Sequence, residues 1–218
     1  MISLKDVQDN PKVIELIKKS DEYLGRIGYT EHGSRHAKLV SDIAKNVMLK
    51  LGYSGKEAEL ASIAGYLHDI GNVMSRKDHA QSGALLSFSI LNEMGMGISD
   101  LLEIVTAIAN HEEIEDGIPI STITSAVIIA DKADVHKSRV KNTNPATFDI
   151  HDRVNYAVSK SFVYIGKGSI KLELSIDTKF SPIMEYFEIF LDRMMIMKKA
   201  SEFLGCKFSL VINNTKII

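Results

Sequence analysis

The sequence YLHDIG at residues 66–71 joins an apolar helical stretch to a histidine and an aspartate. Leu60, Ala64 and His68 are spaced by four residues, so a helix through them directs His68 toward the protein interior. Asp69 follows where that helix is expected to end. Because buried charge is costly without a partner, this pair of side chains predicts a functional site rather than an ordinary core position.

Asp131 lies on an apolar stripe of another expected helix. It is spaced by four from Val127 and Val135, and Ile123 lies one further turn back. A carboxylate on such a face costs several kcal/mol unless it is paired or binds a metal.

A second inward histidine comes from the helix expected at about residues 30–51. His32 lies two turns before Leu39, on the stripe that includes Ile43, and His36 is a rival one turn further on. Polar groups that converge from several helices need a common partner. The sequence therefore predicts a divalent cation among them.

The fold class predicted is mainly α, a helical bundle with a small C-terminal β-β-α-β appendage. Hydrophobic periodicity, caps and turn residues predict the domain division at 1–158 and 159–218. The expected helices cover about 11–25, 30–51, 54–71, 80–94, 99–109 and 122–141, followed by a short helix to about 159. Alternating apolar residues predict strands at 162–165, 169–176 and 206–212, with a helix at 182–204 before the last.

The order His32, then His68-Asp69, then Asp131 resembles the His…His-Asp…Asp signature of the HD superfamily of metal-dependent phosphohydrolases. Residues 66–71 are similar to the family's apolar-apolar-His-Asp-Ile-Gly motif, and residues 129–133 (IADKA) resemble its last helix. The resemblance covers about residues 30–140 and implies an HD-type helical bundle with the metal between helices. In its register His36 takes a position that is usually apolar, so His32 is the expected ligand.

Two more histidines extend the resemblance. In HD proteins with two metals, histidines at the places of His79 and His111 complete the second site. The cyclic-dinucleotide phosphodiesterase branch is similar, but it carries two adjacent histidines where this chain has Asn110 and His111. It also has Gly-Tyr-Pro where residues 117–119 read GIP. These departures argue against cyclic di-GMP as the substrate.

The resemblance implies a phosphohydrolase, either a phosphomonoesterase or a phosphodiesterase. It would cleave a phosphate ester, such as a nucleotide or a related small phosphorylated molecule, by metal-activated water. Nitrogen and oxygen ligands without a thiolate suit one or two catalytic ions of Mn, Fe, Co, Ni, Mg or Zn. Asp69 is expected to bridge two ions or orient the nucleophile. Two alternatives stay open: an HD-type diiron oxygenase and a non-catalytic metal-binding regulatory module.

Basic residues lie beside these ligands in the sequence. They either form a solvated helix face or bind substrate phosphate. Lys132, next to Asp131, is the expected catalytic cation. The candidates for phosphate binding are Arg35, Arg76, Lys77, Lys132, Lys137 and Arg139.

Composition restricts the partners. The chain has 218 residues and a formal net charge of -2, which does not favour a nucleic acid polymer. Its apolar runs are far shorter than the ~20 residues that span a bilayer, so no membrane partner is expected. A single cysteine, Cys206, excludes a disulfide within the chain, and no signal peptide is evident, so we expect a cytoplasmic protein.

The helix at 182–204 carries two apolar stripes. The small sheet can cover one of them. The other either packs on the helical domain or forms a homodimer interface. The stripes are Phe187, Phe190, Met194 and Met197, and Met184, Leu191 and Met195. We expect this module to take no part in chemistry, and we expect the second His-Asp pair, His151-Asp152, at the surface.

Overall fold

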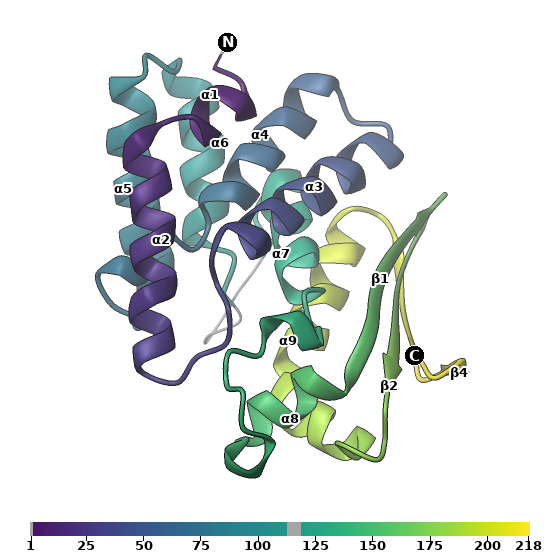
Figure 1. Cartoon of the computed structure of the whole chain (residues 1–218). Helices are drawn as coiled ribbons and strands as arrows, with labels where there is room; N and C mark the ends of the chain where they lie inside the picture. Colours follow the sequence, from purple (N-terminus) through teal and green to yellow (C-terminus); the bar gives the residue numbers. More distant parts are fainter. Residues whose placement is uncertain (1, 113–118) are drawn as a thin grey trace.

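The computed structural model describes residues 2–112 and 119–218. Helices form the first two thirds of the chain, and a small four-stranded sheet lies at the C-terminal end (Figure 1). This confirms the predicted fold class, a mainly α protein in which a helical bundle carries a β-containing appendage. Gly117 and Ile118, which were compared with the Gly-Tyr-Pro motif, lie outside the described residues.

Nine α-helices lie within the described residues, together with three short 3-10 helices. The α-helices are α1 (Leu4–Gln8), α2 (Pro11–Arg26), α3 (Ser34–Lys50), α4 (Gly55–Leu67), α5 (His79–Glu93), α6 (Ile98–Ala109), α7 (Thr122–Lys132), α8 (Ile150–Ala157) and α9 (Ile183–Phe203). The 3-10 helices are η1 (Ile70–Val73), η2 (Lys137–Arg139) and η3 (Pro145–Thr147).

The predicted helix starts agree with local hydrogen bonds. Asn10 caps α2 ahead of Pro11, because its side chain accepts a hydrogen bond from the backbone N–H of Lys12. Ser54 and Glu57 form a reciprocal capping box at the start of α4. That helix was expected to reach residue 71 but ends at Leu67, so the His68-Asp69 pair lies where the chain leaves it.

Two other predicted helices are also too long. The helix expected from about residue 30 begins at Ser34, because the backbone at Gly33 is extended and the N–H of His32 donates to the Asp21 carboxylate. The helix expected to reach residue 141 ends at Lys132, and its end is followed by a tight turn in which the Asp134 N–H donates to the Asp131 carbonyl. His32 and Val135 are buried as predicted, but they lie on loops and not on the helical stripes to which they were assigned.

The sheet follows the predicted strands and adds one. Its order is β1 (Val158–Gly166), β2 (Ser169–Ile176), β3 (Lys207–Ile212) and β4 (Thr215–Lys216). The pair β1–β2 is an antiparallel hairpin, β2 and β3 are parallel, and β3–β4 is a second, very short hairpin. The parallel pair needs a crossover, and α9 supplies it.

Helix α9 lies between α7 and the sheet (Figure 1). Its residues Phe190, Met194 and Met197 are buried in a core that is continuous with the helical domain. Because this core crosses residue 158, the division into 1–158 and 159–218 stays a prediction. No described helix is long and apolar enough to cross a membrane.

The second apolar stripe of α9 is exposed to solvent. Met184, Leu191 and Met195 are exposed, so the interpretation that they pack on the helical domain is wrong. The homodimer interface stays a prediction. Of the second His-Asp pair, His151 is exposed as expected, whereas Asp152 is buried and accepts a hydrogen bond from Asn142.

Gly71 brings two site-bearing segments together. A side chain at this position would overlap the His79 carbonyl oxygen and the backbone nitrogen of Gly83. Since neither is a flexible group, only glycine lets η1 approach α5 this closely. The contact sets His79 beside the His68-Asp69 pair.

Candidate metal centre

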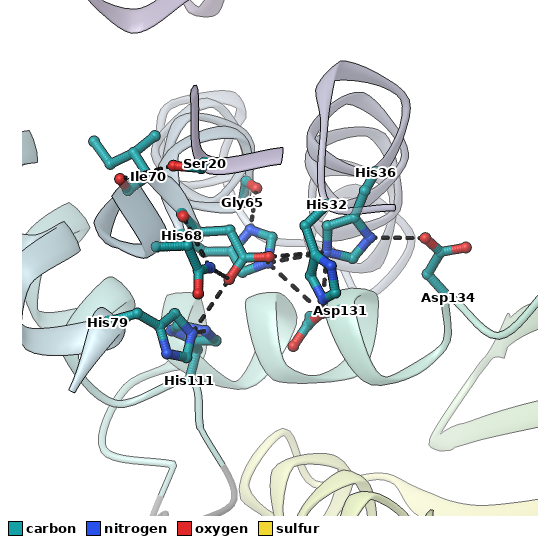
Figure 2. Close-up of polar contacts among 12 residues, drawn as sticks. Ser20, His32, His36, Gly65, His68, Ile70, His79, His111, Asp131 and Asp134 are labelled. Carbon is teal, nitrogen blue, oxygen red and sulfur yellow. Dashed lines mark hydrogen bonds and ion pairs between the residues drawn. The ribbon is translucent and has the colours of Figure 1, made fainter. Parts of the chain in front are cut away.

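Five histidines and two aspartates converge on one region of the helical domain (Figure 2). Each comes from the end of a helix or from an adjoining turn. They are His32 before α3, His36 in the first turn of α3, His68 and Asp69 after α4, His79 at the start of α5, His111 after α6, and Asp131 in the last turn of α7.

The imidazoles meet through their Nε2 atoms. His36 Nε2 lies 3.1 Å from His68 Nε2, and His79 Nε2 lies 3.3 Å from His111 Nε2. Asp131 Oδ1 lies 3.3 Å from His36 Nε2 and 3.6 Å from His68 Nε2. The cluster therefore has two ends, each with a pair of facing imidazoles.

The Asp69 carboxylate spans both ends. Its Oδ1 lies 3.2 Å from His79 Nε2, whereas its Oδ2 lies 3.3 Å from His68 Nε2 and 3.6 Å from His36 Nε2. One oxygen thus faces each pair. This is the arrangement expected of a carboxylate that bridges two ions.

The remaining ring nitrogens fix the orientation of the rings. Nδ1 of His68, His79 and His111 donates to the carbonyl oxygen three residues earlier, at Gly65, Arg76 and Ile108, over 2.8, 3.0 and 2.6 Å. Because a carbonyl accepts but cannot donate, the proton lies on Nδ1, and a neutral ring offers only a lone pair at Nε2.

Facing Nε2 lone pairs repel each other unless a proton or a cation lies between them. The cluster therefore has a donor set that fits a divalent ion: buried imidazole nitrogens and carboxylate oxygens that converge, with their outer nitrogens already hydrogen-bonded. Among the described residues, three groups have ligand atoms close enough to hold an ion: His36, His68 and Asp69; His68, His111 and Asp131; and Asp69, His79 and His111.

Charge in the cluster also favours a cation. Burial opposes protonation of His68 and His79, but nearby carboxylates outweigh it and raise their pKa values to about 10 and about 9. Burial raises the pKa of Asp131, yet Lys132 and the histidines hold it well below its usual value. Burial and the neighbouring charged groups lower the pKa of His111 to about 3. The carboxylates thus stabilise positive charge at the Nε2 atoms.

The geometry favours His36 over His32 as the first histidine of the His…His-Asp…Asp ligand set. His36 Nε2 faces His68 and Asp131, and His36 belongs to one of the three ligand groups, whereas His32 belongs to none. The His32 ring lies beside that of His36, with centroids 5.6 Å apart, and its Nδ1 donates to the Thr30 carbonyl. Sequence reasoning chose His32 because both histidines lie one turn apart near the same helix start, and the choice between them stays a prediction.

Asp134 orients the His36 ring through the ring nitrogen that faces away from the cluster. Its Oδ2 accepts from His36 Nδ1 at 2.7 Å, which directs Nε2 of the same ring into the cluster. Arg35 and Arg139 lie against the same carboxylate, at 2.7 and 3.7 Å. Sequence reasoning missed Asp134, although it follows Asp131 by three residues.

Glu112 is a second residue that sequence reasoning missed. Its Oε1 lies 3.1 Å from His79 Nε2 and 3.3 Å from Arg76 Nη2. Hydrogen bonding from His79 and the charges around it outweigh burial and lower the pKa of Glu112. Its position next to His111, at the end of an apolar helix, was the available signal.

The basic candidates separate into three groups. Arg76 and Arg139 line a cavity beside the cluster, and Arg76 Nη1 lies 3.2 Å from His79 Nε2. Lys132 is buried, with its Nζ 2.8 Å from Asp131 Oδ2. Arg35 binds Glu31 and Asp134, and Lys77 and Lys137 are exposed.

The cavity beside the cluster has a volume of about 410 Å³, within the usual range for small-molecule sites. Residues on α8 and α9 form part of its wall, including His151, Asn155, Phe190 and Arg193. The expectation that the C-terminal module takes no part in chemistry stays a prediction. The module does contribute to a cavity beside the cluster, because α9 packs on α7.

Buried histidines and carboxylates at the ends of packed helices define a helical metal-binding domain. Residues 33–137 match the family model of the HD domain. This match covers just under half of the chain and agrees with the resemblance that the sequence motifs indicated. The matched residues include His36, His68, Asp69 and Asp131, whereas His32 lies just before them.

Similar proteins include an uncharacterized one and one of known structure. The chain is 31% identical over 170 residues to the uncharacterized protein MJ1020 of Methanocaldococcus jannaschii, and the match covers 62% of this chain and 64% of that protein. A crystal structure of a predicted HD superfamily hydrolase from an uncultured Thermotogales bacterium matches with a TM-score of 0.46 and 24% identity. That match covers 57% of this chain and 67% of the other.

Replacing His36 and His32 separately will identify which of them binds the metal. His36→Gln is expected to lower the affinity for divalent metal at least about tenfold, because Gln offers no imidazole nitrogen between His68 and Asp131. His32→Gln is the matched control and should keep most of the affinity. Calorimetric titration with Mn²⁺ measures both. A larger loss in His32→Gln than in His36→Gln would contradict the assignment.

Metal affinity is also expected to depend on pH. Without an ion, His68 and His79 have pKa values of about 10 and about 9, so both are mostly protonated at neutral pH. Binding must displace these protons, and the apparent affinity should rise from about pH 6 to about pH 9. Titration in buffers of different ionisation enthalpy measures the released protons. An affinity that is constant, or that rises as the pH falls, would contradict this account.

Proposed function

We propose that the protein is a metal-dependent phosphohydrolase that cleaves a phosphate ester of a nucleotide or a related small phosphorylated molecule. The observation that carries the proposal is the pair of facing imidazoles at each end of a shared carboxylate, Asp69. In this proposal His36, His68 and Asp131 hold one ion, and His79 and His111 hold a second.

A divalent ion held by these residues would lower the pKa of a bound water from 15.7 to about 7 and would neutralise charge on a phosphoryl group. The nitrogen and oxygen ligands suit Mn, Fe, Co, Ni, Mg or Zn. His32, whose ring is next to that of His36, then lines the approach to the site rather than binding the ion.

The cationic side chains have separate roles in the proposal. Arg76 lies between the cluster and the cavity, so its guanidinium can bind the oxygens of the reacting phosphate. Lys132 keeps Asp131 ionised and oriented, which makes it a positioning residue. Arg35 and Arg139 support the His36–Asp134 contact instead of binding this phosphate.

The proposal also includes the oligomeric state of the protein, its cellular compartment and its partners. The exposed stripe of Met184, Leu191 and Met195 supports a homodimer through the C-terminal module. A single cysteine is consistent with a reducing cytoplasm. Partners are then a small phosphorylated substrate and a second copy of the chain.

Turnover of a panel of phosphomonoesters and phosphodiesters tests the function. The full chain, loaded in turn with each divalent metal, should hydrolyse at least one of them. Asp69→Asn should lose at least about a hundredfold in kcat/KM, since its carboxylate faces both ends of the cluster. Asp42→Asn, which removes an exposed carboxylate on α3, is the control and should be unaffected.

Two outcomes would overturn the proposal. A chain that carries metal but hydrolyses no member of the panel would leave the binding module as the better interpretation. Turnover that requires iron and consumes O₂ would identify the oxygenase instead.

A further inference from the structure

We propose, on the basis of the two ions in the proposed function, that Glu112 is a ligand of the ion at His79 and His111, which is called the second ion below. Arg76 occupies the place of a cation beside Glu112 until that ion binds, and the ion displaces it. The sequence motifs indicated neither this ligand nor this exchange of cations.

The end of the cluster that His79 and His111 form has a carboxylate of its own (Figure 2 shows the two rings side by side). Glu112 Oε1 lies 3.1 Å from His79 Nε2 and 4.0 Å from His111 Nε2. Asp69 Oδ1 lies 3.2 Å from the same nitrogen of His79. Two imidazole nitrogens and two carboxylate oxygens therefore converge at this end, and both are ligand types that divalent transition metals bind.

The other end of the cluster has the same arrangement. There Asp131 Oδ1 lies 3.3 Å from His36 Nε2 and 3.6 Å from His68 Nε2, and Asp69 Oδ2 faces both rings. Each pair of imidazoles thus has one oxygen of Asp69 and one oxygen of a further carboxylate. Glu112 takes the position at one end that Asp131 takes at the other.

The turn after α6 directs Glu112 into the cluster. His111 Nδ1 donates to the Ile108 carbonyl at 2.6 Å, and Asn110 Nδ2 donates to the Thr106 carbonyl at 2.9 Å, so both residues are tied to the last turn of the helix. Glu112 follows directly, and its side chain is only 16% exposed. Because a glutamate is seldom buried without a partner, this position needs a cation close to the carboxylate.

Charge balance gives a second reason for a carboxylate here. If neutral His79 and His111 held the second ion with Asp69 alone, the ion would share one negative charge with the ion at the other end. More than one positive charge would then be unbalanced in a largely buried site, which is unfavourable. Glu112 supplies the missing negative charge, as Asp131 does for the other ion.

Arg76 lies where it competes with an ion for this carboxylate. Its Nη2 lies 3.3 Å from Glu112 Oε1, and its Nη1 lies 3.2 Å from His79 Nε2 and 4.0 Å from Asp69 Oδ1. The guanidinium thus contacts three of the four side chains that hold the second ion in this proposal. Since Arg76 also lines the adjoining cavity, an ion that displaces it leaves the guanidinium available for the substrate phosphate.

Stepwise binding of Mn²⁺ tests the inference. The full chain is stripped of metal with a chelator, dialysed and titrated with Mn²⁺ by calorimetry, while EPR spectra show when a spin-coupled pair of ions forms. The unaltered chain should bind two ions. Glu112→Gln keeps an oxygen but removes the charge. It should bind one ion as before and the second ion at least about tenfold more weakly.

Two further variants show whether Glu112 acts as a ligand. Glu103→Gln removes an exposed carboxylate from α6 and is the matched control, which should bind both ions like the unaltered chain. Arg76→Gln should bind the second ion about threefold or more tightly, because it removes the competing cation. If Glu112 only formed a structural ion pair with Arg76, loss of either partner would weaken binding of the ion.

Three results would overturn the inference. They are an unaltered chain that forms no coupled pair, equal affinity for the second ion in Glu112→Gln and Glu103→Gln, and weaker binding of that ion in both Glu112→Gln and Arg76→Gln. Binding of the other ion with unchanged affinity shows that each variant is folded.

The phosphohydrolase proposal has a separate readout, because binding of Mn²⁺ does not require turnover. Hydrolysis by a chain whose second ion does not depend on Glu112 would reject this inference alone. A second ion that depends on Glu112, in a chain that hydrolyses no phosphate ester, would reject the phosphohydrolase and keep the ligand.

Discussion

Repulsion between imidazole lone pairs is the constraint on which the site depends. His36 and His68 face each other through Nε2, as do His79 and His111, while both oxygens of Asp69 lie between these pairs. In a buried setting such pairs are unfavourable unless positive charge lies among them. The helices can therefore pack around these side chains only when a proton or a metal ion lies among them.

The ends of the helices set the positions and orientations of these side chains. Three of the imidazoles are oriented by the carbonyl three residues earlier, and His36 is oriented by Asp134, so a single hydrogen bond fixes each ring. Gly71 then allows η1 and α5 to approach until the two halves of the cluster meet. Because α9 packs on α7, the same arrangement brings the C-terminal helices to the cavity beside the cluster.

Local patterns predicted most of the fold. The spacing of apolar residues by four predicted that His68 and Asp131 face inward, and both are buried. The alternation of apolar and polar residues predicted the strands of the sheet. The sequence could not separate His32 from His36, because both lie near one helix start, and a contact with Asp21, distant in sequence, decides where α3 begins. Glu112 and Asp134 were also missed, since their partners are set by tertiary packing rather than by spacing along the chain.

The central claim is that His36, and not His32, joins His68, Asp69, His79, His111 and Asp131 around bound metal. Anomalous diffraction from crystals of protein purified without chelator tests it most directly. The account predicts two peaks per chain, one next to His36 and His68 and the other next to His79 and His111. Crystals of folded protein with no peak among these side chains, or with a peak on His32 but none on His36, would contradict it.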